Sequence, residues 1–448
     1  MRLAASLRRA RHAALIALPL GLAACGGGGG DGGHSSIGDP LAEQKSWVAS
    51  YLNDAYLWYA SKPNPDPANY SSVDAFFHAS LSTGSTAGVP KDRWSYTEAT
   101  ASHQQFFSAG QTMGYGVAVA GVEVAGQPNQ PLRVRYIEPA SPAFGKLQRG
   151  ETLLTINGKP ASSYISGGDF SVLSAVNVGD TLTLSVQGTS GTRQVTIAAA
   201  VYNLTPVSVA TILSTPDGTP VGYVVLHDFI TQALTPFDTA FAGFQMAGVD
   251  AVVLDMRYNG GGLVSVADDV ASYMIGAGAV NQPFASLTYS DKKQASNTVF
   301  RFGSKAAALG LGKVYVLTGS RTCSASELVI NGLKPFVTVV QIGDTTCGKP
   351  VGFNPVDHEG TTYSAVNFQS QNASGVGSYY DGIAPTCAVA DDVDHALGDP
   401  AERLTAAALS YVDDKGCPAA SSRDQPMALR ERAATVIEPG QSRGMILR

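Results

Sequence analysis

The sequence predicts a multidomain α/β protein, because the pattern of apolar residues changes twice along the chain. Residues 41–108 carry apolar residues at helical spacing, and residues 109–200 read as short strands joined by turns. From residue 201 onward, apolar strands alternate with helical stretches, which predicts a largely parallel sheet buried under helices. With 448 residues, 44% of them hydrophobic, the chain is long enough for two or three domains.

The first of these regions is expected to be small, helical and polar. Aromatic and apolar residues recur at helical spacing from Trp47 to Trp58, and the proline-rich stretch "KPNPDPANYSS" then interrupts the helix. A second helix is predicted to begin near Ser71, with Asp74 in the position of a capping box. We interpret the aromatic stripe as a packing face of the region 41–108.

The region 201–412 is expected to form the largest domain. Its predicted strands are "VGYVVL", "VDAVVLDM", "KVYVLTG" and "VTVVQIG". Helices are predicted near 233–247, 263–276 and 324–334, followed by a last helix in "PAERLTAAALSYV". The tail 413–448 begins with a polar stretch after Cys417, and we expect it to have no place in the core.

Composition argues against several classes of function. The chain has 30 basic and 36 acidic residues, a net charge of −6, and no basic block in its interior, so nucleic acid is not an expected partner. The seven histidines are scattered, and none has metal-ligand spacing with a second histidine or a cysteine. We therefore expect neither a metal nor a cofactor.

The N-terminus has the layout of a secretory signal. Four arginines precede a twelve-residue apolar stretch, which is shorter than the roughly 20 residues needed to span a bilayer. The stretch ends in "LAAC", which resembles a bacterial lipobox and implies removal of residues 1–24 and lipid attachment at Cys25. The glycine-rich residues 25–40 would then be a tether. The alternative is a plain signal with a chance cysteine.

The lipobox resemblance also implies a location. A lipid at Cys25 would anchor the protein to a membrane of the bacterial cell envelope, facing the periplasm. Gly26 rather than an aspartate follows the cysteine, which favours the outer membrane over the inner one.

A run of three glycines is the first feature that indicates chemistry. In "VVLDMRYNGGGLVSVADDV" a buried strand ends at Asp255, the glycines follow, and a helix begins. Glycines allow backbone N–H groups to approach a ligand closely at a helix N-terminus, where negative charge is favoured. Such a turn can form an oxyanion hole. A tight turn without any ligand is the alternative. A nucleotide loop is disfavoured because no Gly-Lys-Ser/Thr follows.

The stretch "RTCSASELVINGL" places Ser324 at the start of a predicted helix. Taken alone, Ser324 and Glu327 are more easily explained as a capping box than as part of an active site. However, Lys349 lies 25 residues after Ser324, behind the next predicted strand. A lysine whose pKa is depressed by desolvation can act as the base that turns a serine into a nucleophile.

Four cysteines remain after Cys25, and in an exported chain they can form two disulfides in three connectivities. If Ser324 and Lys349 meet in space, a bond between their neighbours Cys323 and Cys347 would brace them. Cys387 and Cys417 would then pair. Free, buried thiols are the alternative.

The region 109–200 resembles a PDZ domain. "MGYGVAV" is followed by "SPA", "GE" and "ING", which are PDZ landmarks. The resemblance implies that the backbone N–H groups of the carboxylate-binding loop receive the C-terminal carboxylate of a peptide, which adds as a strand to the sheet edge. The residues of this loop are Gly114, Tyr115, Gly116 and Val117.

Together, the PDZ-like segment, "DMRYNGGGL", "SASE" and the lysine resemble, in order and spacing, the C-terminal processing (tail-specific) proteases of the S41 serine peptidase family over roughly residues 110–412. The resemblance implies a crotonase/ClpP-like core of ββα units. It implies that Ser324 is the nucleophile, Lys349 the general base, and the N–H groups of Gly261 and Ala325 the oxyanion hole. Ser326 would be a structural serine.

The sequence departs from this family at the residue expected to orient the lysine. Well-known members have a glutamine four residues past the lysine, and here that position is Phe353. Asn354, Asp357 and His358 are the nearby polar candidates for the orienting role. The sequence therefore does not identify the third catalytic residue.

The function expected from the sequence is that of an exported, lipid-anchored serine endopeptidase whose PDZ domain captures C-terminal or unfolded polypeptide segments. A catalytically inactive, peptide-binding lipoprotein of the same fold is the alternative, favoured by the missing glutamine. A third interpretation, a ligand or acyl-CoA site of the crotonase type, would give Ser324 and Lys349 no role.

Overall fold

The computed structural model describes residues 39–120, 131–167, 169–419 and 445–447. The predicted signal segment, the lipidation site Cys25 and the tether up to residue 38 lie outside these residues. Within the described ranges, no helix combines the length and the apolar character that crossing a membrane requires.

A six-stranded sheet forms the centre of the core domain, which we define as residues 207–412. Its strand order is β10-β11-β12-β15-β16-β21, and all neighbouring pairs are parallel except β10 with β11. The strands are β10 (Val207–Ser214), β11 (Pro220–Leu226), β12 (Ala251–Asp255), β15 (Lys313–Thr318), β16 (Thr338–Gly343) and β21 (Cys387–Ala388). The prediction of a largely parallel, buried sheet is confirmed.

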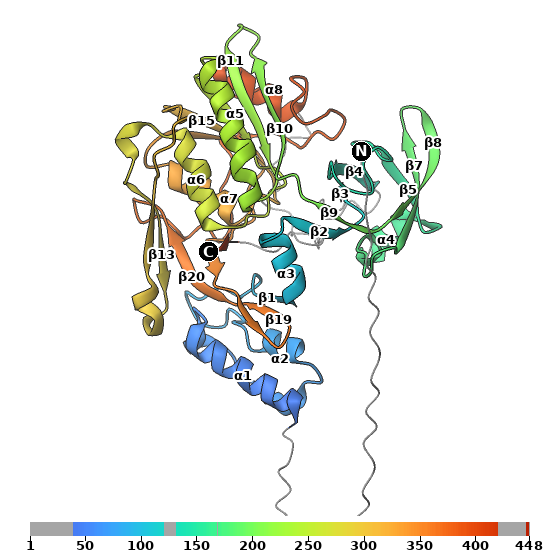
Figure 1. Ribbon diagram of the computed structural model, residues 1–448, viewed down its shortest axis with the longest axis vertical. Coiled ribbons are helices and arrows are strands. Elements are labelled where there is room, and N and C mark those ends of the chain that lie inside the picture. Colours follow the sequence, from blue (N-terminus) through green and yellow to red (C-terminus); the bar gives the residue numbers. More distant parts are fainter. Residues whose placement is uncertain (1–38, 121–130, 168, 420–444, 448) are drawn as a thin grey trace, which may run out of the picture. The chain divides into compact units, whose positions relative to one another are not determined.

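Helices cover both faces of this sheet. α5 (Leu234–Met246), α6 (Val264–Met274) and α7 (Ala325–Leu333) lie on one face, and α8 (Arg403–Val412) lies on the other (Figure 1). Successive side chains of a strand point to opposite faces, so Val224 packs toward α5–α7 while Tyr223 packs toward α8. All four predicted helices are confirmed, because their apolar spacing matched a face that the sheet buries.

A second sheet, with the order β14-β13-β20-β17-β22, packs in the same hydrophobic core as α5–α7. Its strands are β14 (Thr298–Arg301), β13 (Pro283–Tyr289), β20 (Val366–Gln371), β17 (Val351–Phe353) and β22 (Met445–Ile446). Met445 and Ile446 are 0% exposed, so the expectation that the tail 413–448 has no place in the core is wrong for these residues. The two apolar side chains complete the edge of the sheet beside β17.

The N-terminal region is helical, as predicted, but it is not independent of the core domain. Its helices are α1 (Pro40–Ala55), α2 (Val73–Ala79) and α3 (Thr100–Phe107). The strand β1 (Tyr96–Ala99) pairs with β19 (Thr361–Ser364), which pairs with β18 (Val356–His358). The aromatic stripe is a packing face, since the ring of Trp47 stacks on that of His358 with the ring centroids 3.9 Å apart.

The start of α2 corrects one local prediction. Ser72, rather than Ser71, is the N-cap, because its side chain accepts a hydrogen bond from the N–H of Ala75.

Residues 111–203 form a β domain with a hydrophobic cluster of its own. Its main sheet contains β3 (Val117–Ala120), β4 (Arg133–Ile137), β5 (Thr152–Ile156), β6 (Lys159–Pro160), β7 (Thr181–Gly188) and β8 (Gly191–Ala198). The pair β2 (Gln111–Gly114) and β9 (Ala200–Asn203) flanks it in sequence, and α4 (Ala161–Gly167) follows β6. A hairpin joins β7 and β8, where Gly188 lies opposite Gly191, in line with the predicted short strands joined by turns.

Candidate active site

Ser324 stands at the N-terminus of α7 in a strained backbone conformation. Its φ of 62° and ψ of −110° lie outside the regions that non-glycine residues ordinarily adopt. The side chain is 0% exposed, and Oγ has no hydrogen-bond partner among the described residues. A serine that serves only as a helix cap would use this oxygen to accept a backbone N–H. The predicted capping box is present in its position, and Glu327 accepts the N–H of Ser324 at 2.8 Å, but Ser324 Oγ itself makes no hydrogen bond of normal geometry to a described residue and stays buried.

Glu327 connects Ser324 to residues 344–350, the loop between β16 and β17 that we call the Lys349 loop. Oε2 accepts the backbone N–H groups of Ser324 and Lys349, each at 2.8 Å. Oε1 accepts the N–H of Gly348 at 2.8 Å and the hydroxyl of Thr346. Burial raises the pKa of Glu327, and these hydrogen bonds oppose that shift. The carboxylate thus fixes the start of α7 and the residues before β17 relative to each other.

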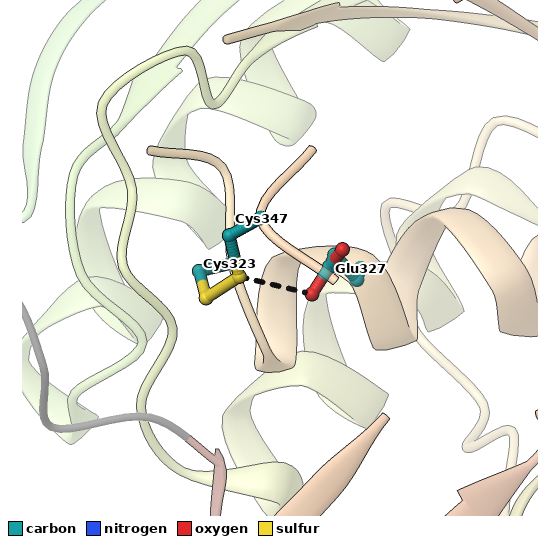
Figure 2. Close-up of side chains that lie close together, drawn as sticks. All are labelled: Cys323, Glu327 and Cys347. Atoms are coloured by element: carbon teal, nitrogen blue, oxygen red, sulfur yellow. Dashed lines mark hydrogen bonds between the residues drawn. A yellow bond between two sulfur atoms is a disulfide. The ribbon is translucent and has the colours of Figure 1, made fainter. Parts of the chain in front are cut away.

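Two disulfides are present, Cys323–Cys347 and Cys387–Cys417. The first joins the residue before Ser324 to the Lys349 loop, directly beside Glu327 (Figure 2). A disulfide sulfur carries no proton, so the 3.4 Å approach of Cys347 Sγ to Glu327 Oε2 is a close contact rather than a hydrogen bond. Although these three side chains cluster within 4.8 Å, the bonded sulfurs offer no thiolate to a metal.

Lys349 is buried, with only 2% of its surface exposed. Desolvation lowers the pKa of Lys349 from 10.5 to about 7, while the negative charges of Asp92 and Glu327 act in the opposite direction. A large fraction of the amine is therefore neutral near pH 7. Because Ser324 Oγ has no partner, it forms no hydrogen bond with Lys349 Nζ.

Phe353, at the position where a glutamine was expected to orient the lysine, places its side chain beside the amine of Lys349. Lys349 Nζ lies 4.0 Å from the centroid of the Phe353 ring. The three polar candidates for orienting the lysine are engaged elsewhere. Asn354 bonds to Tyr289, Asp357 accepts from Thr362, and His358 stacks on Trp47.

A segment of the N-terminal region, residues 92–96, supports the Lys349 loop. Arg93 donates to the carbonyls of Cys347 and Tyr380, at 3.3 and 2.9 Å. Tyr96 packs edge-on against Phe353, with ring centroids 5.6 Å apart. This contribution was missed at the sequence level because no local pattern links residues some 250 positions apart.

The triple-glycine run lies against Ser324. Gly261 has a φ of +112°, and a Cβ at this position would lie 2.9 Å from Ser324 Cβ and 3.1 Å from the nitrogen of Ala325. Only glycine fits there. The N–H of Ala325 has no hydrogen-bond partner in the described part of the chain, whereas the N–H of Gly261 donates to Asn259 Oδ1 at 2.8 Å. Of the two N–H groups predicted to form the oxyanion hole, that of Ala325 is free and that of Gly261 is already hydrogen bonded.

Asn259 organises this turn and was not singled out from the sequence. Its side chain is 0% exposed and donates to the carbonyl of Leu226 at 3.0 Å. Its own carbonyl accepts the N–H of Cys323 and the hydroxyl of Ser326, both at 3.0 Å. The two serines of "SASE" are thereby distinguished, since the Ser326 hydroxyl is bonded and the Ser324 hydroxyl is not. The available signal was a polar residue directly before the glycines.

An ionic cluster anchors the base of the glycine turn. Arg257 is 2% exposed and bonds bidentately, at 2.7 and 2.9 Å, to Glu402, the N-cap residue of α8. It also donates to Asp255 at 3.0 Å, and Asp255 accepts the hydroxyl of Tyr223 at 2.6 Å. Fully paired buried charges hold their geometry, because separating one partner would leave an uncompensated charge.

The loop Gly114–Val117 of the β domain lines a pocket that residues of the core domain also line. The pocket walls include Arg135, His227, Tyr258 and Gly260, the last of which begins the triple-glycine run. Gly116 has a φ of +78°, and a Cβ there would lie 1.9 Å from Ser141 Cβ. The loop therefore requires glycine at this position and packs on the "SPA" segment.

The arrangement combines three groups that acyl-transfer chemistry uses. Ser324 supplies an unpaired hydroxyl, Ala325 supplies an unpaired N–H at a helix N-terminus, and Lys349 supplies an amine that is partly neutral at pH 7. Glu327, the first disulfide and Asn259 hold the backbone segments that carry these groups.

Comparisons with known proteins point to the same chemistry. Residues 220–389 match the model of peptidase family S41, and residues 43–96 match the model of the peptidase S41 N-terminal domain. The first match contains Ser324, Lys349 and the triple glycine, and the second contains Asp92 and Arg93. Together the two matches cover half of the chain.

Curated relatives are similar over part of their length. The carboxyl-terminal-processing protease of Synechocystis sp. is 28% identical over 162 residues, 36% of this chain and 36% of that protein. Carboxyl-terminal-processing peptidase 3, chloroplastic, of Arabidopsis thaliana is 28% identical over 213 residues, 45% of this chain and 39% of that protein. The matched regions therefore span little more than a third of the relatives' own length.

Solved structures resemble the fold more completely. A structure described as an S41 protease of Bacteroides fragilis has a TM-score of 0.64 and 26% identity, covering 82% of this chain and 97% of that one. The photosystem II D1 C-terminal processing protease, with a TM-score of 0.51, 18% identity and coverage of 78% and 92%, shares the fold. With both family models matched, and with the buried serine and lysine inside the first match, the chain belongs to peptidase family S41.

Proposed function

We propose that this protein is a serine endopeptidase in which Ser324 is the nucleophile and Lys349 is the general base. The observation that carries the proposal is the Ser324 hydroxyl, which is buried, unpaired and held in a strained backbone beside the free N–H of Ala325. Leaving a buried polar group unsatisfied costs about 1–3 kcal/mol, so an arrangement without a function would be unfavourable.

In the proposed reaction, the neutral amine of Lys349 takes the proton of the Ser324 hydroxyl as Oγ attacks the carbonyl carbon of a peptide bond. The oxygen of the tetrahedral intermediate accepts a hydrogen bond from the N–H of Ala325. The lysine then returns the proton to the departing amine, and an acyl-enzyme ester remains on Ser324. Water, deprotonated by the same amine, releases the acyl product and restores the hydroxyl.

The proposed second oxyanion donor, Gly261, requires a local change. Its N–H is bonded to Asn259 Oδ1 and becomes available only if that hydrogen bond breaks. The first step also needs Ser324 Oγ and Lys349 Nζ to approach each other, since they are not hydrogen bonded. Substrate binding would therefore complete the site, as closure does in enzymes whose catalytic groups are assembled by the substrate.

We further propose that the β domain acts as a PDZ domain and that the core domain is of the crotonase/ClpP-like type. The backbone N–H groups of the loop Gly114–Val117 would bind the C-terminal carboxylate of a polypeptide in the pocket that the loop lines, whose charged lining residues are Arg135, Glu138 and Asp228. Gly260 lines the same pocket, so occupancy of the loop can be sensed by the glycine turn beside Ser324.

The proposed location is the periplasmic face of the cell envelope, through a lipid at Cys25. Two disulfides fit an oxidising compartment. Cys25→Ala should move the protein from the membrane fraction to the soluble fraction. Unchanged fractionation would contradict the lipoprotein proposal.

The test of the catalytic proposal compares three proteins that lack residues 1–25: wild type, Ser324→Ala and Lys349→Ala. The substrate is casein, an unstructured protein, and cleavage is followed by peptide mass spectrometry. We expect cleavage by the wild type alone. Cleavage by none of the three would favour the second candidate, a catalytically inactive peptide-binding protein, which the missing Ser324–Lys349 hydrogen bond and Phe353 support.

A further inference from the structure

Residues 445–447, which we call the resident strand, form hydrogen bonds on both sides. β22 (Met445–Ile446) runs parallel to β17, with Gly352 opposite Met445 and Phe353 opposite Ile446. The N–H of Leu447 donates to the carbonyl of Phe353 at 3.1 Å. On the other side, the N–H of Ile446 donates to the carbonyl of Gly262 at 2.9 Å.

The two segments that hold the resident strand each carry part of the proposed active site. Gly262 directly follows Gly261, which lies against Ser324. β17 begins two residues after Lys349, and the ring of its last residue, Phe353, lies beside the lysine amine. The resident strand therefore lies between the glycine turn and the strand that follows the base.

The contacts are those of a peptide added to a sheet edge. Main-chain hydrogen bonds do not depend on sequence, whereas buried side chains select for apolar residues. Met445 and Ile446 are both 0% exposed. Gly352 permits the close approach, since a Cβ there would lie 2.8 Å from the carbonyl oxygen of Met445. Without the resident strand, β17 would be an open edge strand that begins two residues after Lys349.

We propose that the resident strand occupies the strand-binding subsite for the polypeptide substrate, and that it is displaced by extended segments with two consecutive apolar side chains. The chain thereby carries its own competitor. That the displacing polypeptide is a substrate rests on the proposed function. The binding site itself, the edge of β17 that faces Gly262, can be tested without catalysis.

The first test measures binding in a Ser324→Ala background, where no turnover can occur. The probe is a fluorescein-labelled peptide with the sequence of residues 443–448, RGMILR. Its C-terminus is amidated, so that it offers no carboxylate to the loop Gly114–Val117. Adding Met445→Asp places a charge in the buried position of Met445 and should release the resident strand.

If the resident strand fills the subsite in about nine molecules of ten, its release should tighten probe binding about tenfold, because apparent affinity scales with the fraction of open sites. The matched control is Met246→Asp, at a methionine that is 85% exposed, and it should leave probe affinity unchanged. Equal affinity in the Met445→Asp and parent proteins would overturn the proposal, as would failure of both to bind.

The second test needs no destabilising substitution. Amide hydrogen exchange at Ile446 and Leu447 is followed in the Ser324→Ala protein with and without saturating probe. Displacement should speed exchange at both amides. Unchanged protection with the probe bound would show that residues 445–447 are a fixed structural strand. Because neither test requires cleavage, a failure of this inference is distinguishable from a failure of the peptidase proposal.

Discussion

The buried lysine makes a quantitative prediction about pH. The pKa of Lys349 is lowered from 10.5 to about 7 because burial disfavours the ammonium form more than the nearby Asp92 and Glu327 favour it. The difference means that the site destabilises the ammonium form, relative to a lysine in water, by about 5 kcal/mol, taking about 1.4 kcal/mol for each pH unit. The folded protein thus contains a usable base at neutral pH.

The rate of acylation of Ser324 should follow the neutral fraction of Lys349. With a pKa of about 7, that fraction rises about tenfold between pH 6 and pH 8 and only about 1.1-fold between pH 8 and pH 9. An unshifted lysine would instead give about a 100-fold rise over the first interval and a further rise of about tenfold over the second. The plateau above pH 8 is therefore the diagnostic feature.

The assay is the second-order rate of labelling by a fluorophosphonate, read by intact-protein mass spectrometry. Ser324→Ala should remain unlabelled. In Lys349→Arg the labelling rate at pH 8 should fall by at least about 100-fold, because a guanidinium cannot be deprotonated in a protein. The control Lys334→Arg makes the same exchange just after α7 and should label normally. A labelling rate independent of pH, or retained in Lys349→Arg, would refute the role of Lys349 as base.

Substitutions at Gly261, at Glu327 and in the two disulfides test the parts that hold the site. Gly261→Ala should abolish labelling, since its Cβ would lie 2.9 Å from Ser324 Cβ. Gly158→Ala, at a φ of +79° and with open space around it, should not, and equal effects of the two substitutions would remove the steric argument. Glu327→Gln places an amide NH₂ group among N–H donors. Chemical denaturation should therefore show a loss of about 2–4 kcal/mol in the free energy of unfolding, and the labelling rate should also fall. The disulfides Cys323–Cys347 and Cys387–Cys417 close loops with sequence separations of 24 and 30. Replacing both cysteines of either one by serine should therefore lower the free energy of unfolding by about the same amount in the two variants, about 3.5 kcal/mol. Only loss of the first disulfide should reduce the labelling rate at a temperature where both variants are folded, and equal rates would deny it a positioning role.

Local sequence patterns were sufficient to predict most of the helices and strands of the core domain. The helices α5, α6, α7 and α8 and the strands β11, β12, β15 and β16 follow from the spacing of apolar residues, because each element buries one face or both. The position of Ser324 at a helix start and that of the triple glycine after a buried strand were likewise readable. These features depend on residues close together in the sequence.

The sequence by itself left the meaning of Ser324 undecided between a cap and a nucleophile. The tertiary structure alone shows that Ser324 Oγ is unpaired and that Asn259 engages Ser326 instead. Which atoms bond in a buried turn depends on distances of a few tenths of an ångström between segments far apart in the chain, and residue spacing does not encode these distances.

The same reason explains the other differences. Asp92 and Arg93 reach the Lys349 loop from the N-terminal region, and Met445 and Ile446 join β17 from a tail expected to lie outside the core. The sequence by itself determined the α/β class, the main helices and strands, and the residue types on which the chemistry depends. Only the tertiary structure decided which groups are buried, paired or free, because burial and pairing are properties of contacts between distant segments.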